Sequence, residues 1–226
     1  MKLSENDFIT KQIHFDFAGV EIDFLEVVNH QELVDQFNAQ IESSMDQPSK
    51  DKLAPYWSRL WFSSIALGEY LAEQKIVEPG MKVIELGCGL GLSGIVASKM
   101  GGDVTFTDYD PNALIFAKKS WELNDASPAK FEIMDWNDPN PDFKADLVLG
   151  ADVAYGPDFG NLLMKTFDVV CKPGGLILLT DPMRSFAKEF YNNFETSIYE
   201  ASLIRKKMKY EGRSQTQRIT SLKKPV

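Results

Sequence analysis

The stretch "VIELGCGLGLSGI", at residues 83–95, decides the fold of this chain. A short apolar run ends in Glu85, and four glycines follow at positions 87, 89, 91 and 94. Glycine loses more backbone entropy on folding than any other residue, so this density indicates that the backbone passes very close to another group. An apolar run that leads through glycines into a helical pattern predicts a strand, a tight turn and a helix.

From residue 81 onward the chain alternates short apolar runs with stretches of helical spacing. Such alternation is typical of parallel strands joined by helices. It predicts an α/β fold with an open, doubly wound, mostly parallel sheet. The predicted strands are residues 82–86, 104–107, 131–134, 145–150 and 175–180, and the predicted helices are residues 92–100, 111–124, 158–171 and 184–194.

The two ends of the chain depart from this rhythm. Apolar and polar residues alternate on both sides of Ala18-Gly19, which predicts a β-hairpin over residues 11–28. Two strand-like runs meet at Glu211-Gly212 and predict a closing antiparallel hairpin. Helical spacing follows the first hairpin over residues 30–45 and recurs over residues 56–74. We therefore expect an N-terminal accessory segment, residues 1–54, and a main domain, residues 55–226.

Composition limits the classes of function. The net charge is −9 and 44% of the residues are hydrophobic, as in ordinary globular proteins. An acidic chain repels phosphate groups, and no apolar run could span a bilayer, so we expect neither nucleic-acid nor membrane partners. The two cysteines make no disulfide framework, and no cluster of cysteines and histidines has metal-ligand spacing. We therefore expect no metal site, and a cytoplasmic protein as the default. The basic stretch over residues 205–226 is either a solvated strand face or a docking patch.

The charge beside the glycines discriminates between cofactors. Residues 89–94 also fit the dinucleotide fingerprint G-x-G-x-x-G, which would make the protein an oxidoreductase. Glu85 disfavours that hypothesis, because its carboxylate would meet an anionic pyrophosphate. It would attract a ligand with an ammonium and a sulfonium group, such as S-adenosylmethionine. Asp108 follows the next strand and could hold ribose hydroxyls under either hypothesis.

These residues resemble a known family. The segment "KVIELGCGLGLSGIVASKMGGDVTFTDYDPNAL" is similar to motif I and the acidic motif of seven-β-strand, class I S-adenosylmethionine-dependent methyltransferases. Three further segments, "PYWSRLWFSSIALGEYL", "MDWND" and "GADVAYG", resemble the family-16 group, which is rich in protein lysine methyltransferases. The resemblance implies a Rossmann-like, seven-stranded fold. It also implies that S-adenosylmethionine is held by Trp61, Glu85, Gly87, Gly89, Gly91, Asp108, Asp135, Trp136 and Asp152.

Residues at strand ends are the candidates for chemistry, because ligands bind there in doubly wound sheets. Asp135 could accept the adenine amino hydrogens while Trp136 covers the ring, although both could be ordinary loop and core residues. We assign catalytic roles to Asp152 and Tyr155, which could orient and contact an acceptor amine. Asp152 could instead cap the following helix.

Two further features have bland alternatives. Trp57 and Trp61 are four residues apart, a spacing that on a helix more often indicates core packing than a cofactor site. Only the family resemblance assigns Trp61 to the cofactor. Cys88 lies inside the glycine loop, and we interpret it as a packing residue because no base is near it in sequence.

The sequence therefore predicts an N-methyltransferase whose acceptor is a lysine side chain of another protein. The acidic charge of the chain fits a cationic acceptor. The alternatives are a methyltransferase acting on a small amine or heterocycle, and a module that binds the cofactor without catalysis.

Overall fold

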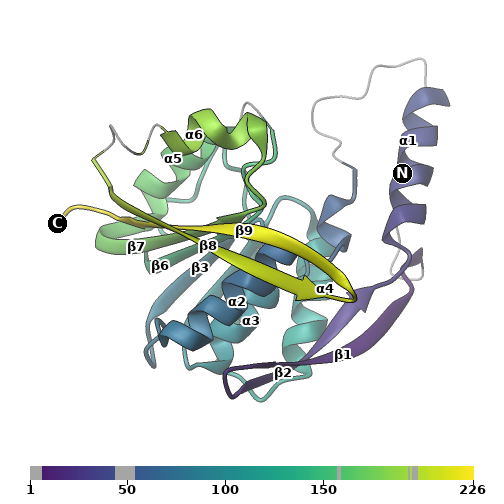
Figure 1. Cartoon of the computed structure of the whole chain (residues 1–226), viewed down its shortest axis with the longest axis horizontal. Helices are drawn as coiled ribbons and strands as arrows, with labels where there is room; N and C mark the ends of the chain where they lie inside the picture. Colours follow the sequence, from purple (N-terminus) through teal and green to yellow (C-terminus); the bar gives the residue numbers. More distant parts are fainter. Residues whose placement is uncertain (1–6, 44–53, 157–158, 193, 195–197) are drawn as a thin grey trace.

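The computed structural model describes residues 7–43, 54–156, 159–192, 194 and 198–226. Its centre is a seven-stranded sheet with helices on both faces (Figure 1). The strands of this sheet are β3 (Lys82–Leu86), β4 (Asp103–Asp108), β5 (Ala129–Ile133), β6 (Ala145–Ala151), β7 (Cys171–Asp181), β8 (Glu200–Tyr210) and β9 (Arg213–Lys223). They lie in the order β5-β4-β3-β6-β7-β9-β8.

The pairing confirms the predicted doubly wound, mostly parallel sheet. Strands β5, β4, β3, β6 and β7 pair in parallel, whereas β9 runs antiparallel to both β7 and β8. After β3 the chain builds the sheet toward β4 and β5, and it then crosses back to add β6 on the other side of β3. The loops that follow β3 and β6 therefore diverge, and such a switch point forms the ligand-binding crevice of this architecture.

Helices bury a hydrophobic cluster on each face of the sheet. One face is covered by α2 (Phe62–Gln74), α3 (Leu92–Lys99) and α4 (Pro111–Glu122). The other is covered by α5 (Phe159–Val170) and α6 (Lys188–Asn192). The start of α4 is fixed by Asp110, whose Oδ1 accepts the backbone N–H of Asn112 at 2.8 Å, and by a proline in the first turn.

The predicted helix over residues 56–74 is wrong in its first part. A short 3₁₀ helix, η2 (Tyr56–Ser58), is followed by extended backbone at Arg59 and Trp61, and α2 begins only at Phe62. Trp61 is the N-cap of α2, where its carbonyl accepts the Ser64 hydroxyl at 2.8 Å. Trp57 and Trp61 therefore share no helix face, and their spacing carries no information about core packing.

The other element boundaries differ less from the predicted ones. The predicted helix over residues 184–194 is a 3₁₀ helix, η3 (Ser185–Ala187), followed directly by the short α6. Strand β7 begins at Cys171 instead of residue 175, and the end of the chain extends its pairing: the Lys224 N–H donates to the Gly175 carbonyl at 3.0 Å. Residue 158 and residues 44–45, at the ends of two predicted helices, lie outside the described residues.

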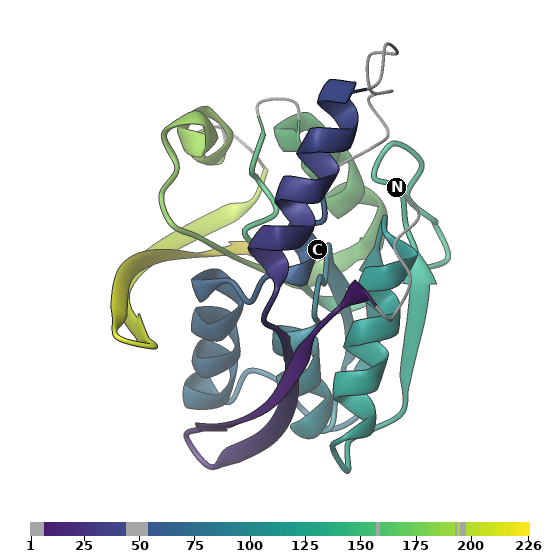
Figure 2. The same ribbon diagram turned by 90° about the vertical axis from the view of Figure 1, so that its right-hand side faces the viewer.

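The N-terminal hairpin packs directly on the main sheet's helices. It consists of β1 (Thr10–Phe17) and β2 (Val20–Val27), turns at Ala18-Gly19 as predicted, and leads into α1 (His30–Ser43). Figure 2 shows the hairpin lying across α3 and α4, and Phe24 is fully buried there. Its residues belong to the same hydrophobic cluster as α2 and α3. The boundary at residue 54 stays a prediction, since the hairpin shares its core with the rest of the chain.

The C-terminal hairpin also turns at the predicted Glu211-Gly212. Its tip reaches back to the N-terminal hairpin (Figure 1), where Lys11 donates to Glu211 at 2.9 Å and the rings of Phe15 and Tyr210 lie 5.8 Å apart. In the part of the chain that the structure describes, no helix has both the length and the apolar content needed to cross a membrane.

Candidate functional site

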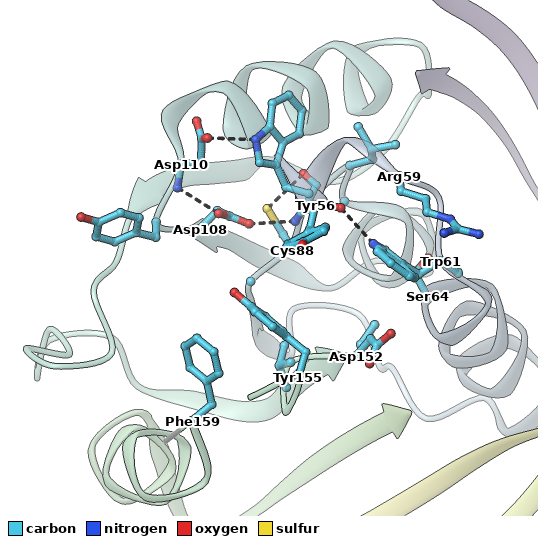
Figure 3. Close-up of a pocket in the computed structure, with 18 of the residues that line it drawn as sticks. Tyr56, Arg59, Trp61, Ser64, Cys88, Asp108, Asp110, Asp152, Tyr155 and Phe159 are labelled. Carbon is cyan, nitrogen blue, oxygen red and sulfur yellow. Dashed lines mark hydrogen bonds between the residues drawn. The ribbon is translucent and has the colours of Figure 1, made fainter. Parts of the chain in front are cut away.

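A cavity of about 850 Å³ lies at the carboxyl ends of β3, β4 and β6 (Figure 3). Its wall combines the η2 segment, the glycine loop and the residues that follow β4, β5 and β6. Phe37 of α1 and Arg184, after β7, complete the wall. This volume is in the range of small-molecule and cofactor sites, so it accommodates a nucleoside-sized ligand.

The glycine loop has the backbone that a close ligand requires. Gly89 and Gly91 have φ values of +53° and +82°, in the left-handed region that favours glycine. A Cβ at Gly89 would lie 3.1 Å from the Trp57 carbonyl oxygen, and one at Gly91 would lie 2.8 Å from the Cβ of Ala117. Both sites are therefore closed to side chains, and the backbone itself lines the cavity. This cradle fits the cofactor that the sequence predicts.

Glu85 lies beneath this loop and does not line the cavity. Its side chain is 1% exposed, and Oε2 accepts the backbone N–H of Gly94 at 3.0 Å, in the first turn of α3. Burial raises the pKa of this carboxyl to about 8. The structure therefore does not place it as the charge that draws a cationic ligand into the loop. What its side chain does is tie the end of β3 to the first turn of α3, on either side of the glycine loop.

Asp108, at the end of β4, faces the cavity as predicted. Its Oδ2 accepts the Gly89 N–H at 2.9 Å and its Oδ1 accepts the Asp110 N–H at 3.0 Å (Figure 3). Burial, which outweighs these hydrogen bonds, raises its pKa to about 6. Asp110 in turn accepts the indole N–H of Trp57 at 2.9 Å, which fixes η2 against the segment between β4 and α4. A carboxylate held in this way can accept the hydrogens of a ribose diol.

Asp135 and Trp136 follow β5 and form another part of the wall. The Oδ1 of Asp135 accepts the backbone N–H of Asn137 at 2.8 Å, which leaves the exposed carboxylate with free acceptor capacity. Trp136 stands edge-on to Phe159, with ring centroids 5.7 Å apart. A Cβ at Gly87 would lie 3.3 Å from the Trp136 ring, so the indole closes over the glycine loop.

Asp152 is fixed by an arginine that the sequence analysis missed. Arg184 donates from Nε to Oδ1 at 2.9 Å and from Nη2 to Oδ2 at 2.6 Å. Asp152 is 8% exposed, has a left-handed φ of +55°, and donates its backbone N–H to the Thr180 carbonyl. Both carboxylate oxygens are engaged by Arg184, so the helix-capping alternative finds no support among the described residues. The signal for Arg184 was its position just after the carboxyl end of a central strand.

Tyr155 occupies the middle of the cavity. Its ring lies 4.6 Å from that of Phe159, and its hydroxyl is on the side that faces Asp108 (Figure 3). Burial, together with the nearby carboxylates, raises the pKa of Tyr155 to about 12. The hydroxyl is therefore a neutral donor at physiological pH.

Trp61 lines the opposite side. Its indole N–H donates to the Tyr56 carbonyl at 3.0 Å, and the guanidinium carbons of Arg59 and Arg184 lie 4.7 and 5.8 Å from its ring centroid. Cys88 is buried in the glycine loop, where desolvation raises its pKa well above the usual value. Its thiol therefore stays protonated and is not a nucleophile.

Comparisons with known proteins identify the family of the chain. A family model described as "Lysine methyltransferase" matches residues 48–197. The chain is 31% identical over 207 residues to EEF1A lysine methyltransferase 3 of Xenopus tropicalis, covering 89% of this chain and 82% of that protein. It is 30% identical over 181 residues to the electron transfer flavoprotein beta subunit lysine methyltransferase of Danio rerio, covering 75% and 69%.

Solved structures share the fold at lower identity. A methyltransferase from Pyrococcus furiosus aligns with a TM-score of 0.58 at 17% identity, covering 88% of this chain and 99% of that one. A precorrin-6y C5,15-methyltransferase from Geobacter metallireducens aligns with a TM-score of 0.56 at 15% identity, covering 71% and 87%. With the matched family and a cavity whose glycine loop fits the cofactor, the chain belongs to the lysine methyltransferase family and is an S-adenosylmethionine-dependent methyltransferase.

Proposed function

We propose that this enzyme methylates the Nζ atom of a lysine in another protein. The observation that supports this most directly is the placement of Asp152 and Tyr155 at the end of β6, in the same cavity as the glycine loop. The names of the relatives, which are lysine methyltransferases of two different proteins, support a protein acceptor. The acceptor protein would meet the cavity on the side of α1, which contributes Phe37 to its wall.

The chain's own groups divide the cofactor between them in this proposal. Asp108 would accept hydrogen bonds from the ribose hydroxyls, while Asp135 and Trp136 would receive the adenine amino group and ring face. Gly87, Gly89 and Gly91 would follow the methionine portion, with Trp61 at its outer side. Glu85 would act on the cofactor only indirectly, by tying β3 to the first turn of α3 on either side of the glycine loop. When bound, S-adenosylmethionine supplies a methyl group activated by a sulfonium.

The acceptor side depends on orientation rather than on a strong base. A lysine amine must be neutral to attack, and Asp152 is already paired with Arg184, so it is not poised to remove that proton. Arg184 instead fixes the Asp152 carboxylate in place, and the remaining lone pairs of its oxygens can accept a hydrogen bond that orients the amine. The Tyr155 hydroxyl and ring face offer a second contact for the same nitrogen. The proton leaves to solvent through the open mouth of the cavity.

The experiment uses methyl-labelled S-adenosylmethionine, the purified enzyme and an extract of its source cells. Asp152→Asn serves as the impaired variant, and Asp142→Asn, an exposed carboxylate away from the cavity, is the matched control. We expect label on lysine in a discrete protein, lost only with Asp152→Asn. Label confined to small molecules would support the amine or heterocycle alternative. Binding of S-adenosylhomocysteine without any label would support a non-catalytic module.

We further propose that the enzyme works in the cytoplasm. Its two cysteines, Cys88 and Cys171, are buried free thiols, a state that reducing compartments maintain. Fractionation of source cells with an antibody against the chain tests this, and enrichment in an oxidising compartment would contradict it.

A further inference from the structure

The charges around the cavity are nearly all accounted for within the chain. Four carboxylates line it, and each has a partner. Asp108 accepts two backbone N–H groups, Asp110 caps α4 and accepts the Trp57 indole, Asp135 accepts from Asn137, and Asp152 is held by Arg184.

The two cationic side chains of the wall differ in whether a carboxylate is paired with them. Arg59 and Arg184 are the two cationic side chains of the described wall. Arg184 is paired with Asp152 at both of its carboxylate oxygens. Among the described residues, no carboxylate lies within ion-pairing distance of Arg59. It is a partly buried guanidinium for which the described part of the chain supplies no counter-charge, in a protein whose net charge is −9.

The position of Arg59 is set by its neighbours. Its guanidinium carbon lies 4.7 Å from the centroid of Trp61, whose indole is itself fixed by the Tyr56 carbonyl. In Figure 3 the Trp61 indole lies between Cys88 of the glycine loop and the Arg59 guanidinium. Arg59 is therefore at the rim, on the far side of Trp61 from the loop.

His30, the first residue of α1, lies beside Trp61 and Ser58. Its ring is 6.4 Å from that of Trp61, and its Nδ1 is 2.8 Å from the Ser58 hydroxyl. Burial, with the charge of Arg59 as a further cause, lowers the pKa of His30. The imidazole is neutral at physiological pH, so Arg59 is the unpaired positive charge that the described residues place at this rim.

We propose that Arg59 binds a carboxylate of the acceptor protein, from an aspartate or glutamate beside the target lysine. A guanidinium that is partly desolvated and held against an indole is well suited to a carboxylate, which it can engage through two parallel hydrogen bonds. Asp152 and Tyr155 would receive the lysine, and the rim arginine would receive its acidic neighbour. The inference deepens the proposed function and rests on it.

The α-carboxylate of the cofactor has the same chemistry and is the competing source. It would lie with the methionine portion along the glycine loop, on the other side of Trp61 from Arg59. The two sources make opposite predictions for S-adenosylhomocysteine, which carries that carboxylate and no acceptor. Its affinity must be unchanged in Arg59 variants if the acceptor supplies the carboxylate.

The test begins with the acceptor protein and lysine identified by mass spectrometry from the extract experiment. Steady-state kinetics on that protein would compare the native enzyme with Arg59→Gln, Arg59→Glu and Arg205→Gln. Arg205 is an exposed arginine of β8 away from the cavity and controls for the loss of one positive charge. Calorimetric titration of S-adenosylhomocysteine into each variant gives the cofactor arm. A final arm exchanges the acceptor's acidic residue for arginine.

We expect Arg59→Gln to raise the acceptor KM about tenfold, with kcat and S-adenosylhomocysteine affinity unchanged. Arg59→Glu should be worse, and the acceptor with the acid-to-arginine exchange should restore it. A methylated lysine with no carboxylate beside it, an unchanged KM, or a parallel loss of S-adenosylhomocysteine affinity would each overturn the inference. Failure of the proposed function looks different: no lysine is labelled by the native enzyme, before any Arg59 variant is tested.

Discussion

Asp152 and Arg184 form a two-point ion pair in the wall of the cavity, with N–O distances of 2.9 and 2.6 Å. The carboxylate belongs to the motif that follows β6, and the guanidinium belongs to the loop that follows β7. The pair thereby ties together the ends of two adjacent parallel strands. A second ion pair lies next to it in sequence. Arg218 of β9 donates to Asp181, at the end of β7, at 2.8 and 2.9 Å, and Asp181 also accepts the backbone N–H of Met183, the residue before Arg184.

Arg184→Gln should cost more in stability than an ordinary surface change. It leaves the Asp152 side chain, only 7% exposed, as an unpaired charge. Because the arginine itself is 32% exposed, we expect a loss of about 2 kcal/mol rather than the larger values of fully buried pairs. The double variant with Asp152→Asn should recover part of this loss. Urea unfolding of the four proteins measures the coupling, and strictly additive losses would show that the two residues do not stabilise each other.

Asp108→Ala should weaken S-adenosylhomocysteine binding about tenfold or more, because a charged acceptor of hydrogen bonds is removed. The native protein should also bind more weakly as the pH falls through about 6, where Asp108 takes up a proton and loses acceptor capacity. Asp108→Asn should show a flat profile over the same range. Calorimetric titration between pH 5 and 8 provides both measurements. Native affinity in the alanine variant would remove Asp108 from the ribose site.

Glu85→Gln should flatten the dependence of stability on pH. Burial raises the pKa of Glu85 from 4.5 to about 8, so the folded state binds this proton more tightly than the unfolded state does. The contribution of Glu85 to the free energy of unfolding is therefore greatest at low pH and declines as the pH rises from about 4.5 to 8. Glutamine keeps the acceptor for Gly94 and has no proton to lose. Denaturant unfolding at pH 5.5 and 8.5 measures the free energy of unfolding of both proteins. An equal change in that free energy between the two pH values for the native protein and the variant would contradict this prediction.

Gly94→Ala should destabilise the fold by about 3 kcal/mol or more, since overpacking at a site that cannot yield is costly. A Cβ at this position would lie 2.4 Å from the Phe106 ring and 2.5 Å from Glu85 Oε2. Gly80→Ala is the matched control, because its Cβ would meet nothing within 4 Å and its cost comes from a positive φ of +78°. That cost is about 1 kcal/mol. Thermal unfolding compares them, and equal losses would mean that α3 shifts to make room.

Patterns confined to one element predicted the fold well. Each predicted strand of the sheet exists, because alternating and continuous apolar runs report burial on one or two faces. Both hairpin turns fell at the predicted dipeptides, where two consecutive residues have positive φ. The prediction of a helix over residues 56–74 was wrong for residues 56–61, because helical spacing of apolar residues does not show where the helix starts. Here the chain makes a 3₁₀ turn and an extended step along the cavity first.

The site was predictable where it follows the backbone and not where it depends on side-chain direction. Asp108, Asp135, Asp152 and Tyr155 reach the cavity because strand ends do. Glu85 is next to the last residue of β3, a strand whose side chains alternate in direction. Its carboxylate therefore faces α3 instead of the cavity side of the glycine loop. Arg184 meets Asp152 across 32 residues of sequence, a separation at which no spacing rule applies.

The contact between the two hairpins has a consequence for how the chain is made. Lys11 and Glu211 are 200 residues apart, so Lys11 and Phe15 are synthesised well before their partners Glu211 and Tyr210. At ribosomal rates of 5–20 residues per second, the first hairpin waits roughly 10–40 seconds for the strands that complete its environment. During that interval Phe15 lacks the Tyr210 ring that packs against it in the folded protein. A nascent chain stalled before β8 should therefore bind chaperones through the β1–β2 hairpin, and release should follow the synthesis of the β8–β9 hairpin.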